Sequence, residues 1–127
     1  MSIKIAQKGL DVTYADVDGE SFKFAEWMLK KNNFLIKMIN LDKENITCQY
    51  DTIVCIDVIE HVLKPDALLR DLASYIKKGG SLIITNLNVN KILEDHPMHF
   101  KVNFGAEEYL KLKGFYKGKL PWLWIKS

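Results

Sequence analysis

Five ionisable side chains stand at or just after the ends of three β-branched segments, and their types suit the binding of a nucleotide. They are Asp16, Asp42, Asp57, Glu60 and His61. A carboxylate that follows a strand can accept hydrogen bonds from both hydroxyls of a ribose. Histidine has an ordinary pKa near neutrality, which suits proton transfer. These residues are therefore the first candidates for a binding and catalytic site.

Each of these candidates also has a purely structural explanation. Asp16 suits the ribose role better, whereas Asp18 suits the N-cap of the helix that follows it. Asp42 could accept a hydrogen bond from an exocyclic amine such as that of adenine, or be a solvated loop residue. Glu60 and His61 could stand at the start of a short helix and bond each other or the backbone. The residues alone leave these alternatives open.

The elements that must position these residues alternate along the chain. Strands are predicted over residues 10–15, 34–41, 50–56 and 81–86. Helices are predicted over residues 20–31, 65–78 and 106–113. Gly79 and Gly80 are expected to end the second of these helices. Strands that alternate with helices predict an α/β fold with a mostly parallel sheet, whose ligands lie at the carboxyl ends of the strands.

The last third of the chain has a different pattern. Residues 87–105 form a long stretch without clear periodicity, which is typical of a substrate loop or lid. Residues 115–120 and 122–126 are expected to form two closing antiparallel strands on either side of Pro121.

Composition limits the class of protein. A chain of 127 residues is the size of one domain, here residues 1–127, and 48% hydrophobic residues exclude global disorder. No apolar run approaches the roughly 18–20 residues that cross a bilayer, and no secretory signal is visible at the N-terminus. Two cysteines do not make a disulfide framework. A reduced, cytoplasmic protein is therefore expected.

Taken together, these segments resemble a class I S-adenosylmethionine-dependent methyltransferase. The most specific likeness is in residues 50–62, Tyr-Asp-Thr-Ile-Val-Cys-Ile-Asp-Val-Ile-Glu-His-Val. They are similar to the fourth strand and following segment of small-molecule methyltransferases of the ubiquinone-biosynthesis type. Residues 9–16 resemble the second strand of that fold with its ribose-binding acid. Residues 68–86 and 96–115 resemble the later helix, glycine turn, strand, loop and last helix.

The resemblance implies a Rossmann-like fold, S-adenosyl-L-methionine as cofactor and a small-molecule methyl acceptor. The residues that it places against the cofactor are Asp16, Val17, Asp42, Ile56 and Asp57. It also implies that Asp57 and His61 face the transferring methyl group as catalytic residues. The methyl group would move by in-line displacement at the sulfonium, a reaction in which the enzyme mainly positions its reactants.

The sequence departs from this family at its beginning. The family's first strand ends in a glycine-rich turn, whereas residues 2–9 here fit the end of the helix after that turn. The family's strand order is 3-2-1-4-5-7-6, so the central strand is expected to be missing. A longer gene product, a strand from a second chain or direct pairing of the neighbouring strands would each repair this gap. An open strand edge favours self-association, so a homodimer is one expected partner.

Loss of the glycine-rich turn also allows a different class of function. Without it, the domain would be a catalytically inactive binding or assembly module. Cofactor binding discriminates between this alternative and the enzyme.

Two further ligand classes fit the sequence less well. Residues 109–127 hold five lysines and five aromatic residues but no acid, as in single-strand nucleic-acid surfaces. In a closing hairpin, however, the aromatic residues alternate into the core and the lysines face water, so nucleic acid is not expected. His96 and His99 have a ligand-like spacing, but Pro97 disfavours a ligand-presenting helix there. No metal site is predicted.

Overall fold

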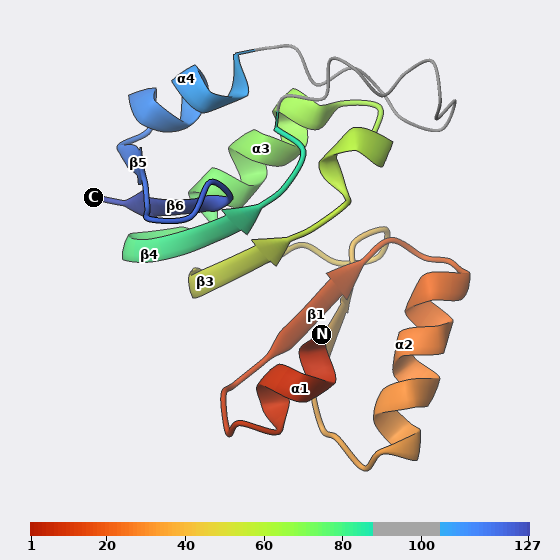
Figure 1. Cartoon of the computed structure of the whole chain (residues 1–127). Helices are drawn as coiled ribbons and strands as arrows, with labels where there is room; N and C mark the ends of the chain where they lie inside the picture. The colour runs from red at the N-terminus through yellow and green to blue at the C-terminus, as the bar shows by residue number, and fades with distance from the viewer. Residues whose placement is uncertain (88–104) are drawn as a thin grey trace. The chain divides into compact units, whose positions relative to one another are not determined.

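A computed structural model describes residues 1–87 and 105–127 of the chain (Figure 1). The described residues form two compact units, Met1–Thr47 and Cys48–Ser127. Nearly all of the predicted irregular stretch over residues 87–105 lies outside the described residues. None of the helices in the described part has the length and apolar content needed to cross a membrane.

Unit 1 contains two helices and a pair of parallel strands. Its elements in chain order are α1 (Ser2–Ala6), β1 (Thr13–Asp16), α2 (Glu20–Lys31) and β2 (Lys37–Asn40). In the ladder, Thr13 lies opposite Lys37 and Asp16 opposite Asn40. Both strands are shorter than predicted, but they are parallel as the alternation of strands and helices requires. Their carboxyl ends therefore lie side by side, which brings the segments after Asp16 and Asn40 together.

Helix α2 has the bounds that its sequence predicts. Glu20 lies in its first turn and two lysines lie in its last turn, which complements the charge separation of the helix dipole. Its inner face buries Leu29 and places the ring of Phe22 6.2 Å from that of Tyr14, centroid to centroid. Local signals were sufficient here because the terminal charges and the apolar stripe lie within the helix itself.

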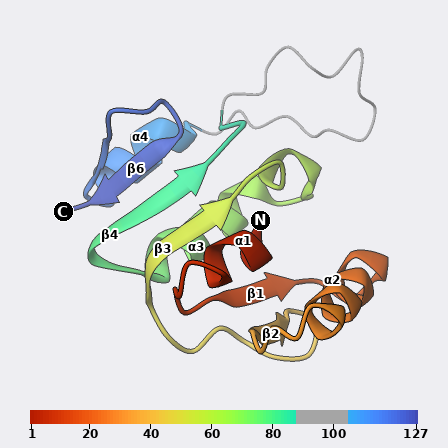
Figure 2. The ribbon, with the colours of Figure 1, turned by 60° about the horizontal axis from the view of Figure 1, so that its bottom comes forward.

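Unit 2 is a mixed sheet covered by helices. Its elements are β3 (Tyr50–Cys55), the 3₁₀ turn η1 (Ile59–His61), α3 (Pro65–Ser74), β4 (Ile76–Ile84), α4 (Ala106–Leu112), β5 (Phe115–Lys117) and β6 (Leu123–Lys126). The strand order is β3-β4-β6-β5. β3 and β4 run parallel, whereas β6 is antiparallel to β4 (Figure 2). β6 is also antiparallel to β5. A parallel pair followed by an antiparallel hairpin agrees with the predicted fold class.

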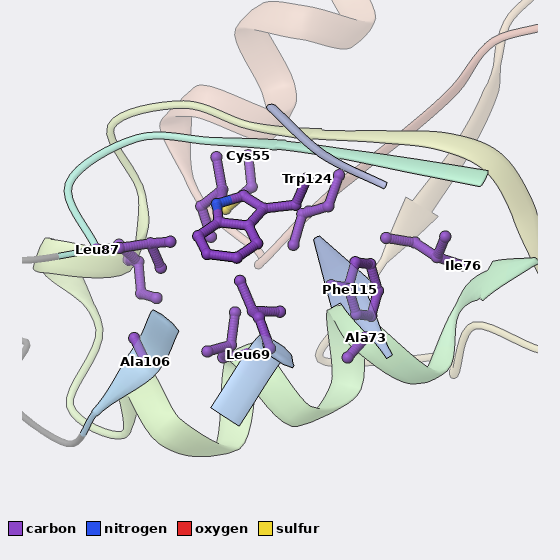
Figure 3. Packing of buried hydrophobic residues seen from close by; sticks show 12 residues of the cluster. Cys55, Leu69, Ala73, Ile76, Leu87, Ala106, Phe115 and Trp124 are labelled. Atoms are coloured by element: carbon purple, nitrogen blue, oxygen red, sulfur yellow. The ribbon is translucent and has the colours of Figure 1, made fainter. Parts of the chain in front are cut away.

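The core of unit 2 lies between the sheet and the face of α3 and α4 that is turned toward it. Trp124 points from β6 toward Leu69 of α3, and both side chains are fully buried (Figure 3). Ile76, Phe115 and Leu110 belong to the same buried cluster. Each such side chain stabilises the fold by about 1.5–3 kcal/mol through burial alone. This packing fixes where β3 and β4 end, and so where the polar residues after them begin.

The end of α3 differs from the sequence prediction. The helix was expected to reach residue 78, but it ends at Ser74, and β4 already begins at Ile76. The amide of Tyr50 donates to the carbonyl of Tyr75 at 2.7 Å, so pairing with β3 draws the chain out of the helix. This contact joins residues that are far apart in the sequence. Helix propensity depends on local sequence only, so it could not predict the contact.

Gly79 and Gly80 consequently lie inside β4 and do not cap a helix. A Cβ atom on Gly80 would come within 2.8 Å of the carbonyl oxygen of Asp51 and 2.9 Å of that of Lys77. The ladder between β3 and β4 also shifts register between Tyr50 and Thr52. Gly80 therefore allows the two strands to approach at this irregularity.

Candidate functional site

Asp16 ends β1 with its carboxylate held from two sides. Its Oδ1 accepts a hydrogen bond from the backbone amide of Val17 at 2.9 Å. Its Oδ2 accepts one from the hydroxyl of Tyr14 at 2.8 Å. Each carboxylate oxygen can accept more than one hydrogen bond, so a held carboxylate can still receive donors from a ligand. The arrangement gives Asp16 a fixed orientation at the carboxyl end of the strand.

Tyr14 holds its proton firmly in this arrangement. Partial burial raises the pKa of Tyr14 to about 12, and the hydrogen bond to Asp16 and its negative charge add to the shift. The tyrosine is therefore a hydrogen-bond donor to Asp16 over the whole physiological pH range. Sequence reasoning missed Tyr14, although a signal was present: it lies two residues before Asp16, on the same face of the strand.

Asp42 lies beside Asp16 in unit 1, after the end of β2. Its Oδ2 accepts a hydrogen bond from the backbone amide of Asp18 at 2.8 Å, and its own amide donates to Oδ1 of Asn40 at 3.1 Å. The amide of Leu41 also donates to the carbonyl of Asp16 at 2.9 Å. The structure thus brings together Asp16 and Asp42, two of the residues singled out in the sequence.

The expectation that Asp18 caps α2 is wrong. The N-cap is Gly19, and no side chain caps the helix. The carboxylate of Asp18 instead lies 3.2 Å from the ammonium of Lys43. The hydrogen bond and positive charge of Lys43 hold the pKa of Asp18 below its ordinary value. A partner beyond β2 in the sequence has therefore displaced the local capping contact.

Unit 2 has its own polar cluster where β3 and β4 end. The hydroxyl of Thr85 accepts a hydrogen bond from the amide of Asp57 at 2.9 Å and donates to Oδ1 of Asp57 at 3.2 Å. The side-chain amide of Asn86 donates to the same oxygen at 2.9 Å and also to Oε1 of Glu60. Asp57 is exposed, so its carboxylate is oriented yet open to solvent.

Glu60 is the buried member of this cluster. Only 2% of the residue is exposed. Its Oε2 has no hydrogen-bond partner among the residues that the structure describes. The charge of Glu60, after burial itself, contributes to raising the pKa of the Cys55 thiol to about 11. The alternative that puts Glu60 and His61 in a short helical turn agrees with η1, but the side-chain partner of Glu60 is Asn86.

The remaining predicted residues are accessible. Val17 is 55% exposed and Ile56 is 36% exposed. His61 is exposed in the last position of η1, where its backbone amide donates to the carbonyl of Val58 at 2.9 Å. Accessibility suits contact with a ligand, and the roles predicted for these three residues stay predictions.

Sequence reasoning also missed Thr85 and Asn86. They directly follow the apolar run that ends β4, so the rule that ligands meet the carboxyl ends of parallel strands could have found them. No group of three or more His, Cys, Asp or Glu side chains in residues 1–87 and 105–127 could hold a metal ion. His96 and His99 lie outside the described residues.

Comparisons with known proteins identify the family. A family model described as "Methyltransferase domain" matches residues 2–112. The ubiquinone biosynthesis O-methyltransferase of Rickettsia akari is 30% identical over 93 residues, which cover 72% of this chain and 37% of that protein. The protein of the same name from Proteus mirabilis is 27% identical over 116 residues, covering 88% of this chain and 45% of its own length. The chain therefore spans less than half the length of these two relatives.

Solved structures agree on the fold. The magnesium protoporphyrin IX methyltransferase of Synechocystis PCC 6803, solved with bound SAH, superposes with a TM-score of 0.72 at 18% identity. The superposition covers 99% of this chain and 68% of that one. The family match extends over most of the sequence, and the strand pairing agrees with it. The chain accordingly belongs to the class I S-adenosylmethionine-dependent methyltransferase family.

Proposed function

We propose that this chain binds S-adenosyl-L-methionine and acts as a small-molecule methyltransferase or as part of one. The observation that carries the proposal is the fixed carboxylate of Asp16 at the carboxyl end of β1. Tyr14 and the amide of Val17 orient it, and its remaining lone pairs suit the two hydroxyls of a ribose. Val17 is the next residue in the chain, and its exposed side chain contacts the same ligand in this proposal.

Asp42 binds the base of the cofactor in this proposal. One carboxylate oxygen accepts from the amide of Asp18, which fixes the side chain. The other oxygen, Oδ1, accepts a hydrogen bond from the exocyclic amine of adenine. Support comes from the shared edge of unit 1, since Asp16 and Asp42 follow the paired strands β1 and β2.

The residues after β3 have two separate roles in the proposal. Ile56 offers an apolar contact to the cofactor, and Asp57 offers an oriented and accessible carboxylate. When bound, S-adenosyl-L-methionine supplies an electrophilic methyl group on a sulfonium. His61 removes the proton of an acceptor hydroxyl or amine as the methyl group is transferred, because imidazole is the side chain most often used as a general base. These roles follow from residue chemistry and from the family.

A binding or assembly module without catalysis is the second candidate. It is favoured by one observation of the sequence, which has seven glycines but no glycine-rich turn after a strand. Such turns let the backbone approach a cofactor closely. The chain as given would then bind S-adenosyl-L-methionine weakly or not at all.

Self-association also belongs to the proposal. Among residues 1–87 and 105–127, β3 is an edge strand of the unit 2 sheet and pairs with β4 alone. Its residues Ile53 and Val54 are β-branched, and Val54 is 39% exposed. Open edges of this composition pair readily with other strands. We therefore expect a homodimer, which light scattering during size-exclusion chromatography would detect; a monomer at every concentration would refute it.

A calorimetric titration with S-adenosylhomocysteine tests the main proposal. We expect micromolar binding by the wild type and an affinity at least about tenfold lower for Asp16→Ala, since charge-assisted hydrogen bonds to the ribose are lost. Asp11→Asn is the matched control, because Asp11 is an exposed acid of the same unit and should leave the affinity unchanged. Absence of wild-type binding at millimolar ligand would contradict the proposal and favour the inactive module.

A further inference from the structure

The chain adopts an uncommon backbone conformation just after β3 and again just after β4. Asp57 has φ = 52° and Asn86 has φ = 61°, both in the left-handed region. Among non-glycine residues in the described part, only Asn33 shares a positive φ. Aspartate and asparagine tolerate this region better than other side chains, but it is still less favourable than the β region. Some other interaction must therefore hold both residues in place.

The side chain of Asn86 supplies that interaction. Its amide nitrogen donates to Oδ1 of Asp57 and to Oε1 of Glu60. An asparagine amide has two N–H groups, so the two carboxylates use both. We call these two contacts the Asn86 bridge. The bridge ties the segment after β3 to the segment after β4, across the parallel pair.

The bridge reduces the electrostatic repulsion between the carboxylates of Asp57 and Glu60. Two carboxylates close together repel each other, and the repulsion is stronger where water is excluded. Glu60 is almost fully buried and accepts its one hydrogen bond among the described residues from Asn86. Removal of the amide would leave a buried carboxylate without a donor and facing Asp57. The segment 57–61 would then have to move to rehydrate Glu60.

We propose that Asn86 is a positioning residue of the methyl-transfer site. Its bridge holds Asp57, and with it the turn through His61, in the orientation that meets the cofactor and acceptor. The assignment rests on the proposed function, in which Asp57 and His61 contact the reacting molecules. Strained backbone and buried polar groups are retained at sites where orientation matters more than stability. Asn86 itself touches neither reactant.

The test compares Asn86→Gly with Asn33→Gly. Glycine accepts a positive φ without strain, so each variant removes an asparagine side chain and keeps the backbone conformation. Amide hydrogen exchange of residues 56–63 is followed by mass spectrometry, and thermal unfolding confirms that each variant is folded. We expect at least about tenfold faster exchange in Asn86→Gly, as for a local opening that has become easier. Asn33→Gly should leave the exchange of this segment unchanged.

Asn86→Asp provides a second and sharper variant. It preserves the shape of the side chain but faces Asp57 and Glu60 with a third carboxylate. We expect exchange faster than in Asn86→Gly at neutral pH, with protection partly restored at mildly acidic pH, where a shared proton can replace the amide. His61 and the thiol of Cys55 are the other titratable groups at this end of β3, and the comparison with wild type at each pH removes their contribution.

Titration with S-adenosylhomocysteine completes the test. For folded Asn86→Gly we expect an affinity about tenfold lower than wild type, with Asn33→Gly unchanged. Unchanged exchange in both Asn86 variants would overturn the bridge, whatever the ligand does. Faster exchange with undiminished affinity would overturn the positioning role. A wild type that does not bind the ligand would instead overturn the proposed function, and exchange alone would then decide whether the bridge exists.

Discussion

The carboxylate of Asp42 accepts a hydrogen bond from the backbone amide of Asp18 at 2.8 Å, although 24 residues separate the two in the sequence. The bond joins the loop after β2 to the loop after β1. It also explains why neither aspartate behaves as an isolated loop residue, since Asp18 in turn pairs with Lys43. The two loops of unit 1 are therefore one connected structure.

Replacing Asp42 should loosen this connection. Asp42→Ala removes the acceptor for the Asp18 amide, and we expect the free energy of unfolding to fall by about 1 kcal/mol, as for one solvent-accessible hydrogen bond. Asp42→Asn is the matched control, because its amide oxygen can still accept the same bond. Urea unfolding measures the difference. Equal losses in the two variants would show that the hydrogen bond contributes nothing to stability.

Tyr14 should make stability depend on alkaline pH. Its pKa is about 12 in the folded chain against an ordinary value of 10.0. A raised pKa of this kind stabilises the fold fully below pH 10, and the contribution is lost as the pH rises from 10 toward 12. Tyr14→Phe should therefore lose less stability over this interval than wild type. In a pH titration followed by tyrosinate absorbance, Tyr14→Phe should also lack the most alkaline step that wild type shows.

Tyr116→Phe is the control for this experiment, because Tyr116 is 54% exposed. It should follow wild type in stability between pH 10 and 12. If Tyr116→Phe and Tyr14→Phe shift the curves alike, the burial of Tyr14 and its contact with Asp16 are not the origin of the pH dependence.

The two cysteines should differ in reactivity. Cys55 is buried, and burial together with the charge of Glu60 raises its pKa to about 11, whereas Cys48 is exposed. The thiolate is the reactive form, so a disulfide reagent at mildly alkaline pH should modify Cys48 rapidly and Cys55 slowly. Denaturant should make both react at the same rate. Cys48→Ser should abolish the fast phase, and a fast phase that survives would contradict the burial of Cys55.

The core of unit 2 should be sensitive to truncation. Leu69 is fully buried against Trp124, so Leu69→Ala should lower the free energy of unfolding by about 2–5 kcal/mol. Leu112→Ala makes the same change at a side chain that is 85% exposed and should cost at most about 0.5 kcal/mol. Trp124 fluorescence reports the unfolding transition when the other two tryptophans are replaced, as Trp27→Phe and Trp122→Phe. Similar costs for both leucines would contradict the packing.

Local patterns predicted most of the elements, and their limits are instructive. The whole of α2 could be predicted because its charges and apolar stripe are contained within it. The end of α3 could not, because Tyr75 is held by Tyr50 of another strand. The same holds for Asp18, whose partner Lys43 follows the next strand. Contacts between distant residues override local preference, and the sequence does not display them.

The candidate site divides in the same way. Asp16, Asp42 and Asp57 could be proposed as candidates because acidic residues after strands are a pattern that a single sequence can show. Their supporting residues, Tyr14 and Asn86, were not found because a tyrosine inside a strand and an asparagine after one have many ordinary roles. Only the distances of 2.8 Å from Tyr14 to Asp16 and 2.9 Å from Asn86 to Asp57 reveal what they do.

The two neighbouring glycines of β4 restrict evolution differently. Gly79 has φ = 77° with open space where a Cβ would lie, so its constraint is conformational, and asparagine is an acceptable replacement. Gly80 faces the carbonyl oxygens of Asp51 and Lys77 within 3 Å of a Cβ position, so even alanine is excluded. Functional proteins that descend from this one should therefore accept substitutions at position 79. They should almost always keep glycine at position 80.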